Sequence, residues 1–137
     1  MALATGLIDA YQNADYVVFT DPELVLRIGE PSPRLDALLE AEGATAAAYI
    51  TAANPRGEPT SAWKNEIANA ALVETHTKAG YRCFEGEGRD PENRRAAEPS
   101  VLVIGIYRAN AVTVGRIFGQ NAIVFVEKGS APELVIC

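Results

Sequence analysis

Cysteine and histidine are scarce in this chain of 137 residues, and their scarcity removes several classes of function. The cysteines are Cys83 and Cys137, without a Cys-x-x-Cys spacing, and His76 is the only histidine. Such a set offers neither a disulfide framework nor a cluster of metal ligands. We therefore expect two free thiols in a reducing cytosol and no bound metal.

The sequence also lacks the segments that mark membrane proteins and cofactor enzymes. No apolar run approaches the roughly 20 residues that span a bilayer. The first 14 residues are interrupted by polar side chains and lack a basic start, so they do not form a signal peptide. Neither a P-loop nor a dinucleotide fingerprint occurs, and Gly86-Glu87-Gly88 is interpreted as a plain turn. We predict a cytoplasmic protein without a cofactor and without a membrane partner.

An excess of positive charge is also missing. The chain has 18 acidic and 12 basic residues, a net charge of -6 and a pI of about 4.8. This balance disfavours a nucleic-acid partner, because phosphate binding needs a basic surface. Hydrophobic residues make up 48% and charged residues 22%, which is typical of a globular protein. The length predicts a single domain over residues 1–137.

Periodicity and turn residues place the elements along the chain. Ser32 before Pro33, and Ser61 before a long helical pattern, are typical N-caps. We predict helices over residues 6–13, 33–42, 62–79 and 109–118. We predict strands over residues 16–19, 24–28, 44–52, 81–87, 101–107, 122–126 and 133–136, of which the first two form an antiparallel hairpin. The long helix is expected to bury a face of small residues, Ala68, Ala71, Leu72, Thr75 and Ala79, with His76 on the surface.

The order of these elements predicts an α+β fold. From about residue 44 to 126 the order is βαββαβ, the ferredoxin-like pattern, preceded by a helix and a hairpin and followed by a short edge strand. Right-handed crossovers then bring loops 54–60, 86–99 and 119–121 to one end of the sheet. The N-terminus of the long helix should lie at the same end, where its dipole favours anions.

Polar side chains in these loops form the candidate site. Arg56 and Arg89 either pair with Asp90 and Glu98 or bind an external anion. Gln120 and Asn121 either tie the loops together or contact the polar edge of a ligand. The loop acids are interpreted first as ion-pair partners of the arginines, and an acid/base pair among them is the less favoured alternative. The candidate ligand-binding residues are Asn54, Arg56, Ser61, Asn65, Glu87, Arg89, Asp90, Glu98, Gln120 and Asn121.

Four motifs in these loops carry a resemblance to a known family. They are Tyr49-Ile50-Thr51-Ala52-Ala53-Asn54-Pro55-Arg56, Gly86-Glu87-Gly88-Arg89-Asp90-Pro91, Glu98-Pro99-Ser100 and Phe118-Gly119-Gln120-Asn121-Ala122-Ile123. In order and spacing they resemble a small bacterial family of unknown function, family 3293 of the domains of unknown function, from about Tyr49 to Val135. The resemblance implies a bacterial or phage-borne cytosolic protein and supplies no activity. The chain departs from the pattern at residues 94–97, where an aromatic residue is expected.

Two classes of function follow from the sequence. The leading hypothesis is the binding of a small anionic or nucleotide-like molecule where the three loops meet. The alternative is a non-catalytic interaction module that forms a homodimer through an open sheet face or the edge strand 133–136. RNA binding on the sheet face ranks third because of the acidic balance. The sequence leaves open whether the protein is an enzyme.

Overall fold

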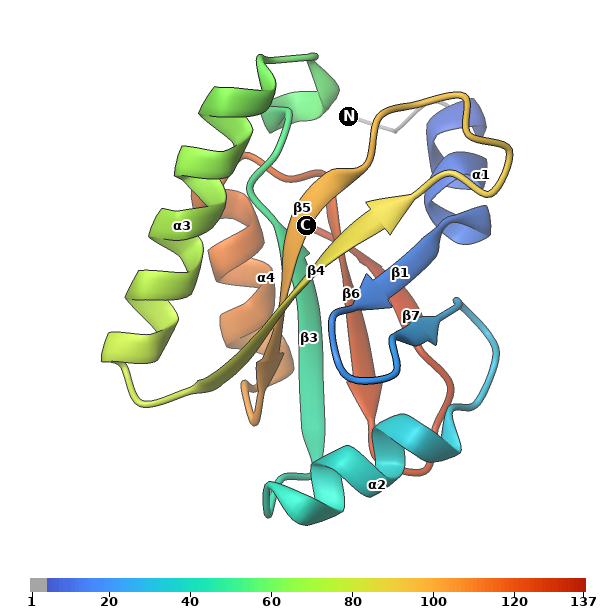
Figure 1. The fold of residues 1–137 in the computed structure, drawn as a ribbon, viewed down its shortest axis with the longest axis vertical. Coiled ribbons are helices and arrows are strands. Elements are labelled where there is room, and N and C mark those ends of the chain that lie inside the picture. Colours follow the sequence, from blue (N-terminus) through green and yellow to red (C-terminus); the bar gives the residue numbers. More distant parts are fainter. Residues whose placement is uncertain (1–4) are drawn as a thin grey trace.

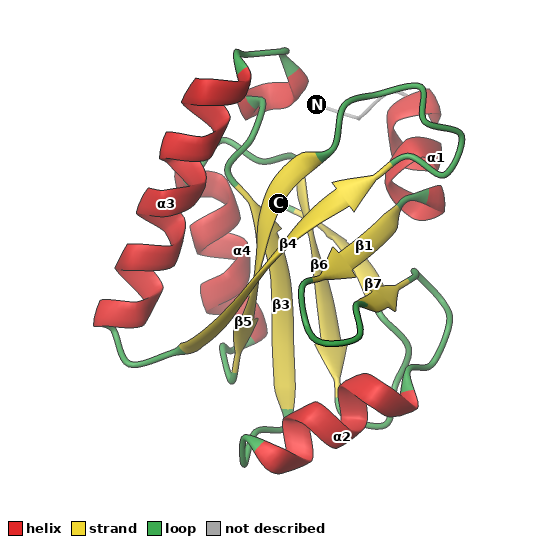
Figure 2. Ribbon diagram, in the orientation of Figure 1, coloured by secondary structure: helices red, strands yellow, loops and turns green. Residues whose placement is uncertain are grey.

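The computed structural model describes residues 5–137 of the chain. These residues form a mixed α/β fold of four α-helices and a curled, antiparallel sheet of seven strands (Figure 1, Figure 2). The helices are α1 (Thr5–Asn13), α2 (Pro33–Ala41), α3 (Ala62–Lys78) and α4 (Arg108–Ile117), with a short 3-10 turn, η1 (Pro55–Gly57). The strands are β1 (Asp15–Val18), β2 (Leu24–Leu26), β3 (Ala46–Thr51), β4 (Arg82–Arg89), β5 (Glu98–Ile104), β6 (Ala122–Glu127) and β7 (Glu133–Ile136).

The capping signals in the sequence form as predicted. The Ser32 hydroxyl accepts a hydrogen bond of 3.2 Å from the backbone N–H of Leu35 and begins α2. The Ser61 hydroxyl accepts one of 3.1 Å from the N–H of Lys64 and begins α3. Each cap satisfies one of the N–H groups that a helix start leaves without an intrahelical partner.

The strands lie in the order β2-β1-β4-β5-β3-β6-β7, and all neighbours are antiparallel. The predicted hairpin of β1 and β2 and the predicted edge strand β7 are confirmed. The sequence did not predict that β1 also pairs with β4 and extends the sheet. The sheet curls so far that its two edge regions come into contact. The N–H of Gly29, after β2, donates to the carbonyl of Pro132, before β7, at 2.9 Å.

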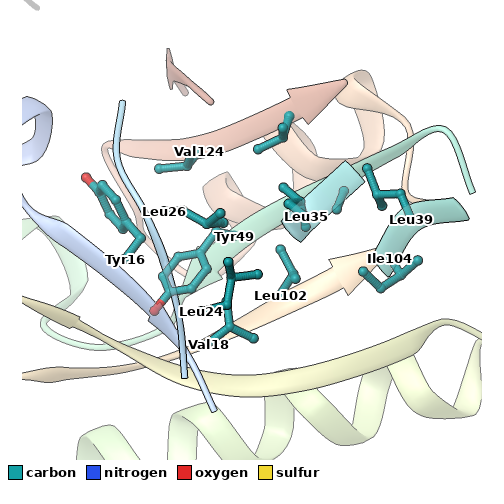
Figure 3. Close-up of a cluster of buried hydrophobic side chains, with 12 residues drawn as sticks. Tyr16, Val18, Leu24, Leu26, Leu35, Leu39, Tyr49, Leu102, Ile104 and Val124 are labelled. Atoms are coloured by element: carbon teal, nitrogen blue, oxygen red, sulfur yellow. The ribbon is translucent and has the colours of Figure 1, made fainter. Parts of the chain in front are cut away.

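Each face of the sheet is covered by its own apolar cluster. On one face, α3 and α4 cover a cluster that includes Ile50, Leu72 and Val103 (Figure 2). On the other face, α2 and the β1–β2 hairpin cover the inner core, which Figure 3 shows. The inner core consists of Tyr16, Val18, Leu24, Leu26, Leu35, Leu39, Ala47, Tyr49, Leu102, Ile104, Val124 and Val126. The sheet face that was expected to be open for a partner is therefore covered.

Two strands are longer than the sequence predicted. Residues 86–99 were assigned to a loop with a turn at Gly86-Glu87-Gly88, and this was wrong at both ends of the range. Strand β4 continues through these three residues to Arg89, and β5 already begins at Glu98, opposite Gly88. The hydrogen bonds between strands join backbone groups, so strands can pair whatever the polarity of their side chains. The polar side chains at these strand ends concealed the pairing from a reading based on hydrophobicity.

The buried face of α3 also differs from the prediction. Ala71, Thr75 and Ala79 are exposed, and the buried residues are Asn65, Asn69, Leu72 and His76. His76 was expected on the surface, yet it is 3% exposed and its Nδ1 lies 2.7 Å from the carbonyl oxygen of Leu72. Buried polar side chains are stable when they find hydrogen-bond partners, and a sequence pattern does not show those partners.

Cys83 and Cys137 are free thiols, as predicted, and both are half-buried. Burial raises the pKa of each thiol, so a smaller fraction of each is present as the reactive thiolate. None of the helices within residues 5–137 is long and apolar enough to cross a membrane.

Candidate functional site

Three loops meet at the end of the sheet where β3 and β4 finish and β5 and β6 begin. We call this region, formed by residues 52–61, 89–98 and 118–121, the loop end (Figure 1). The backbone N–H of Arg56 donates to the carbonyl of Gly119 at 2.7 Å, and the Gln120 side chain donates to the carbonyl of Ala53 at 3.0 Å. The Asn54 side chain donates to Glu98 at 2.6 Å. The loop end is therefore one connected unit.

Two asparagines and a threonine organise the centre of the loop end. The side-chain oxygen of Asn65 on α3 accepts from the backbone N–H of Asn54 at 2.9 Å, and its amide donates back to Asn54 Oδ1 at 2.9 Å. The backbone N–H of Thr60 also donates to Asn54 Oδ1, at 3.0 Å, and its hydroxyl donates to Asn65 Oδ1. Asn54 adopts a left-handed conformation with φ of 45°, which asparagine tolerates better than most residues. The network fixes the direction in which the Asn54 amide points.

The Asn54 amide points at Glu98, the first residue of β5. Its Nδ2 donates to Glu98 Oε2, and within the described residues no hydrogen bond to Oε1 is formed. Burial raises the pKa of Glu98, while the hydrogen bond from Asn54 and the charge of Arg95 lower it to a smaller extent. Glu98 is thus a partly desolvated carboxyl with one oxygen held in place, an arrangement that suits proton exchange or recognition of a hydrogen-bond donor.

Tyrosine hydroxyls line the same end of the inner core. The Tyr16 hydroxyl donates to the carbonyl of Tyr11 on α1, and Asn121 donates to the Tyr11 hydroxyl at 3.3 Å. The Tyr49 hydroxyl donates to the carbonyl of Val17 at 2.8 Å. Burial raises the pKa of both Tyr16 and Tyr49, so both stay neutral donors at physiological pH, and the charge of Glu98 also raises the pKa of Tyr16. These contacts hold α1 beside the loop end although none of its side chains is fully buried.

A shallow hollow of about 190 Å³ lies between the end of β4 and the following loop. It is lined by Glu87, Arg89, Asp90, Asn93, Arg95 and Ala97. Arg89 is already paired, because its guanidinium lies 2.6 Å from Glu87 and 3.2 Å from Glu23. Both carboxylates raise the pKa of Arg89, and Glu87 has the larger effect.

Asp90, on the same hollow, is paired as well. Its carboxylate lies 3.1 Å from the guanidinium of Arg94 and accepts the backbone N–H of Glu92. The hydrogen bond from Arg94 lowers the pKa of Asp90 most, and the hydrogen bond from the N–H of Glu92 lowers it further. Arg95 is the one lining cation that forms no ion pair among residues 5–137.

The structure brings some of the predicted site residues together and separates others. Asn54, Asn65 and Glu98 share one hydrogen-bonded network. The Gln120 side chain ties loops together by donating to Ala53 and Phe118. Arg89 lies apart from this network, because its side chain is held by Glu87 and Glu23.

The remaining predicted residues occupy the edges of the loop end. The side chain of Arg56 is exposed and forms no ion pair in the part of the chain that the structure describes, while its backbone holds Gly119. Asn121 holds Tyr11, and Ser61 serves as the cap of α3. Glu87 and Asp90 line the hollow.

Four residues in or beside the loop end were missed by sequence reasoning. Thr60 joins the asparagine network, and Arg95 lines the hollow. Tyr16 on β1 is influenced by the charge of Glu98, and Tyr11 on α1 accepts hydrogen bonds from Tyr16 and Asn121. Arg95 lies among the loop acids in sequence, so it was expected to pair with one of them. The two tyrosines gave no signal, because their placement depends on β1 pairing with β4. No group of three or more His, Cys, Asp or Glu side chains within the described residues is placed to hold a metal ion.

Comparison with known proteins identifies the family. The model of a family described as "Protein of unknown function (DUF3293)" matches residues 50–123, more than half of the chain. The chain belongs to this family, as its loop motifs indicated. The matched region contains all three loops of the loop end. No curated protein and no solved structure matches the chain.

Proposed function

We propose that this member of the DUF3293 family binds a small ligand with an anionic group at the loop end. The observation that carries the proposal is Arg95, which lines the hollow and has no carboxylate partner among residues 5–137. A guanidinium recognises a carboxylate or a phosphate through two parallel hydrogen bonds. Arg56 supplies a second exposed and unpaired guanidinium at the same end.

The main cationic contact of the proposed site is not the arginine that the sequence indicated. Arg89 was expected to contact the ligand, but two carboxylates already compensate its charge. The amide nitrogen of Gln120 donates to two loop carbonyls, so Gln120 is not counted among the main ligand contacts. Arg95 therefore takes the place of Arg89 as the main cationic contact, and Arg56 keeps its place.

The proposed fold is the ferredoxin-like one. The order βαββαβ from β3 to β6, and the arrangement β4-β5-β3-β6 of these four strands, support this assignment. Both helices of the pattern, α3 and α4, lie on the same face (Figure 2). In such a fold the loop end gathers residues that are far apart in sequence, which suits a binding site. The family resemblance supports a bacterial, cytoplasmic protein.

A thermal-shift screen tests the ligand proposal. The probes are sodium phosphate, AMP, succinate and citrate, and at least one should raise the melting temperature of the wild-type protein. Arg95→Gln should abolish that rise. Arg82→Gln is the matched control, because Arg82 is an exposed arginine at the opposite end of β4, 3.8 Å from Glu42. The proposal is wrong if no probe stabilises the protein, or if both variants respond as the wild type does.

One observation favours the alternative of an interaction module. Strand β7 pairs with β6 alone within the described residues, and its Ile136 side chain is 52% exposed. An edge strand with an exposed apolar side chain is suited to adding a strand from a second copy. The covered sheet face gives no support to this alternative. Light scattering at high concentration decides it: a strict monomer rules out the homodimer, and Ile136→Lys should dissociate any dimer that forms.

A further inference from the structure

Helices α1 and α2 both contain nine residues, but they are attached to the sheet by different means. α2 inserts Leu35 and Leu39 into the inner core, and both side chains are fully buried. α1 has no fully buried side chain, and among residues 5–137 none of its side chains belongs to either apolar cluster. Apolar burial therefore contributes much less to the attachment of α1 than to that of α2.

Tyr11 makes the hydrogen bonds that attach α1 to the rest of the protein. Its carbonyl is one of the last four of the helix, which have no intrahelical partner, and it accepts from the Tyr16 hydroxyl on β1. Its own hydroxyl accepts from the Asn121 side chain, just before β6, at 3.3 Å. In the part of the chain that the structure describes, no other hydrogen bond joins α1 to another element.

These two bonds place α1 across the open end of the curled sheet. Strands β4, β5 and β3 lie between β1 and β6, so a helix bonded to both sides bridges this end of the inner core (Figure 1). The inner face ends here in a row formed by Tyr16 on β1, Gly88 on β4 and Glu98 on β5, which we call the mouth. A Cβ on Gly88 would meet nothing within 4 Å, so the mouth has open space between the phenol and the carboxyl.

We propose that α1 is a lid over the mouth, pinned by Tyr11, and that it opens as a unit while the sheet and α2 stay folded. Opening breaks two hydrogen bonds and the contacts of half-buried side chains such as Leu7 and Ile8, and it leaves both apolar clusters intact. An element with few buried apolar contacts opens at a lower free energy than the core of the same protein.

Opening of the lid would change the surroundings of the mouth. Tyr16 is 9% exposed, and its hydroxyl loses its acceptor when Tyr11 moves away. Glu98 lies on the same face across Gly88, so the lid controls access to a phenol and a carboxyl. The proposal stands apart from the anion site at Arg95, because neither Tyr11 nor Tyr16 lines the hollow.

Amide hydrogen exchange of the full-length protein, measured for each residue by NMR, tests the proposal. The hydrogen-bonded amides of α1, residues 9–13, should exchange at least about 100-fold faster than those of α2, residues 37–41, after correction for intrinsic rates. The five amides of α1 should show similar protection, because a lid opens as a unit. Fraying from the chain end would instead give protection that rises steadily from residue 9 to residue 13.

Two variants test the pin. Tyr16→Phe removes the hydrogen bond to the Tyr11 carbonyl and should speed exchange in α1 about tenfold further, the effect of one hydrogen bond. Tyr11→Phe removes the bond from Asn121 and should act in the same direction. Tyr49→Phe is the matched control, because it removes a buried hydroxyl that donates to the Val17 carbonyl and does not contact α1. It should leave the ratio of α1 to α2 exchange unchanged.

A chemical probe then shows whether the mouth opens with the lid. Tetranitromethane, with the products mapped by mass spectrometry, should nitrate Tyr16 faster in Tyr11→Phe than in the wild type. Tyr49, which is 3% exposed, should stay unreactive in both. Unchanged reactivity of Tyr16 would mean that the mouth stays closed, and it would overturn the proposal.

The exchange data can also contradict the lid. Equal protection of α1 and α2, or a steady gradient along α1, overturns the proposal. Equal acceleration of α1 by Tyr16→Phe and Tyr49→Phe overturns the role of Tyr11 as the pin. If Tyr16→Phe does not fold, Tyr11→Phe decides, because its side chain is only half-buried and its backbone carbonyl is kept.

Discussion

The two ends of the inner core are closed by different means. At the end opposite the loops, α2 lies across the sheet and inserts Leu35 and Leu39, both fully buried (Figure 3). At the loop end the core finishes in hydroxyl groups, with Tyr16 and Tyr49 bound to backbone carbonyls. One end is sealed by apolar packing, and the other by hydrogen bonds that need specific partners.

This difference separates stability from chemistry. Apolar burial contributes free energy roughly in proportion to area and tolerates changes of sequence that keep the volume. A hydrogen-bonded end contributes less net free energy, and it presents polar atoms in fixed positions. The α2 end therefore accounts for the larger share of stability, and the loop end is where a ligand can be recognised. Substitutions at the two ends test this division.

The largest effect is expected at the α2 end. Leu35→Ala removes a fully buried side chain from the inner core and should lower the free energy of unfolding by about 4 kcal/mol. Leu38→Ala, on the same helix but half-buried, should cost about 2 kcal/mol. Urea denaturation of both variants measures the two values. Equal costs would contradict the view that α2 seals the core through Leu35.

A smaller effect, confined to one of two neighbouring glycines, is expected where β1 pairs with β4. A Cβ on Gly86 would lie 1.9 Å from the carbonyl oxygen of Val17, an impossible contact with backbone. Gly86→Ala should therefore destabilise the protein by about 3 kcal/mol, because β1 must move away from β4. Gly88→Ala is the matched control, since a Cβ two residues along meets nothing within 4 Å. It should change stability by less than about 1 kcal/mol. Thermal melting followed by circular dichroism would show the contrast, and similar melting temperatures for both variants would refute it.

A substitution in the asparagine network should lower the free energy of unfolding by less than Leu35→Ala or Gly86→Ala does. Asn65→Ala removes the partner of the Asn54 backbone N–H and of its side-chain oxygen, which should cost about 2 kcal/mol. Asn110→Ala, at an exposed position of α4, should have almost no effect. Amide hydrogen exchange should show faster exchange in residues 52–61 in the first variant only. Unchanged exchange there would mean that Asn65 does not hold the loop end together.

The sequence predicted the elements well because their signals are local. Serine caps, the hydrophobic period of α4 and the apolar runs of β3 and β6 depend on neighbouring residues only. The convergence of the three loops followed from element order and crossover handedness. The sequence could not show that β1 pairs with β4, since this pairing depends on Gly86, whose missing side chain leaves space for another strand. Gly86 gave no hydrophobic signal, although its missing side chain allows β1 to lie there.

The candidate site was predicted in position but not in detail. Asn54, Asn65 and Glu98 were singled out, and they form one network. Their mutual bonds depend on geometry across 44 residues of sequence, which no periodicity reports. The burial of His76 was missed although its partner, the carbonyl of Leu72, is local and lies one turn earlier on its own helix. Polar residues were assigned outward, and buried polar residues break that rule wherever a partner is near.

The smallest effect expected concerns the pH dependence of stability at the loop end. Burial raises the pKa of Glu98 in the folded protein, so folding disfavours its ionised form. The corresponding stability is fully present below the unfolded pKa, near 4.5, and is lost as pH rises through the folded pKa. Glu98→Gln carries no charge, so its unfolding free energy relative to wild type should increase from about pH 4 to about pH 7.

Urea denaturation at several pH values measures this trend, with the exposed Glu85→Gln as the control. A trend in the opposite direction would mean that ionised Glu98 is stabilised by its neighbours rather than penalised by burial. The same trend in both variants would assign it to net charge rather than to the loop end. Among residues 5–137, the apolar cluster around Leu35 and Leu39 includes no carboxyl group that could produce such a response. A pH-dependent difference confined to Glu98→Gln would therefore separate the two ends by chemistry as well as by stability.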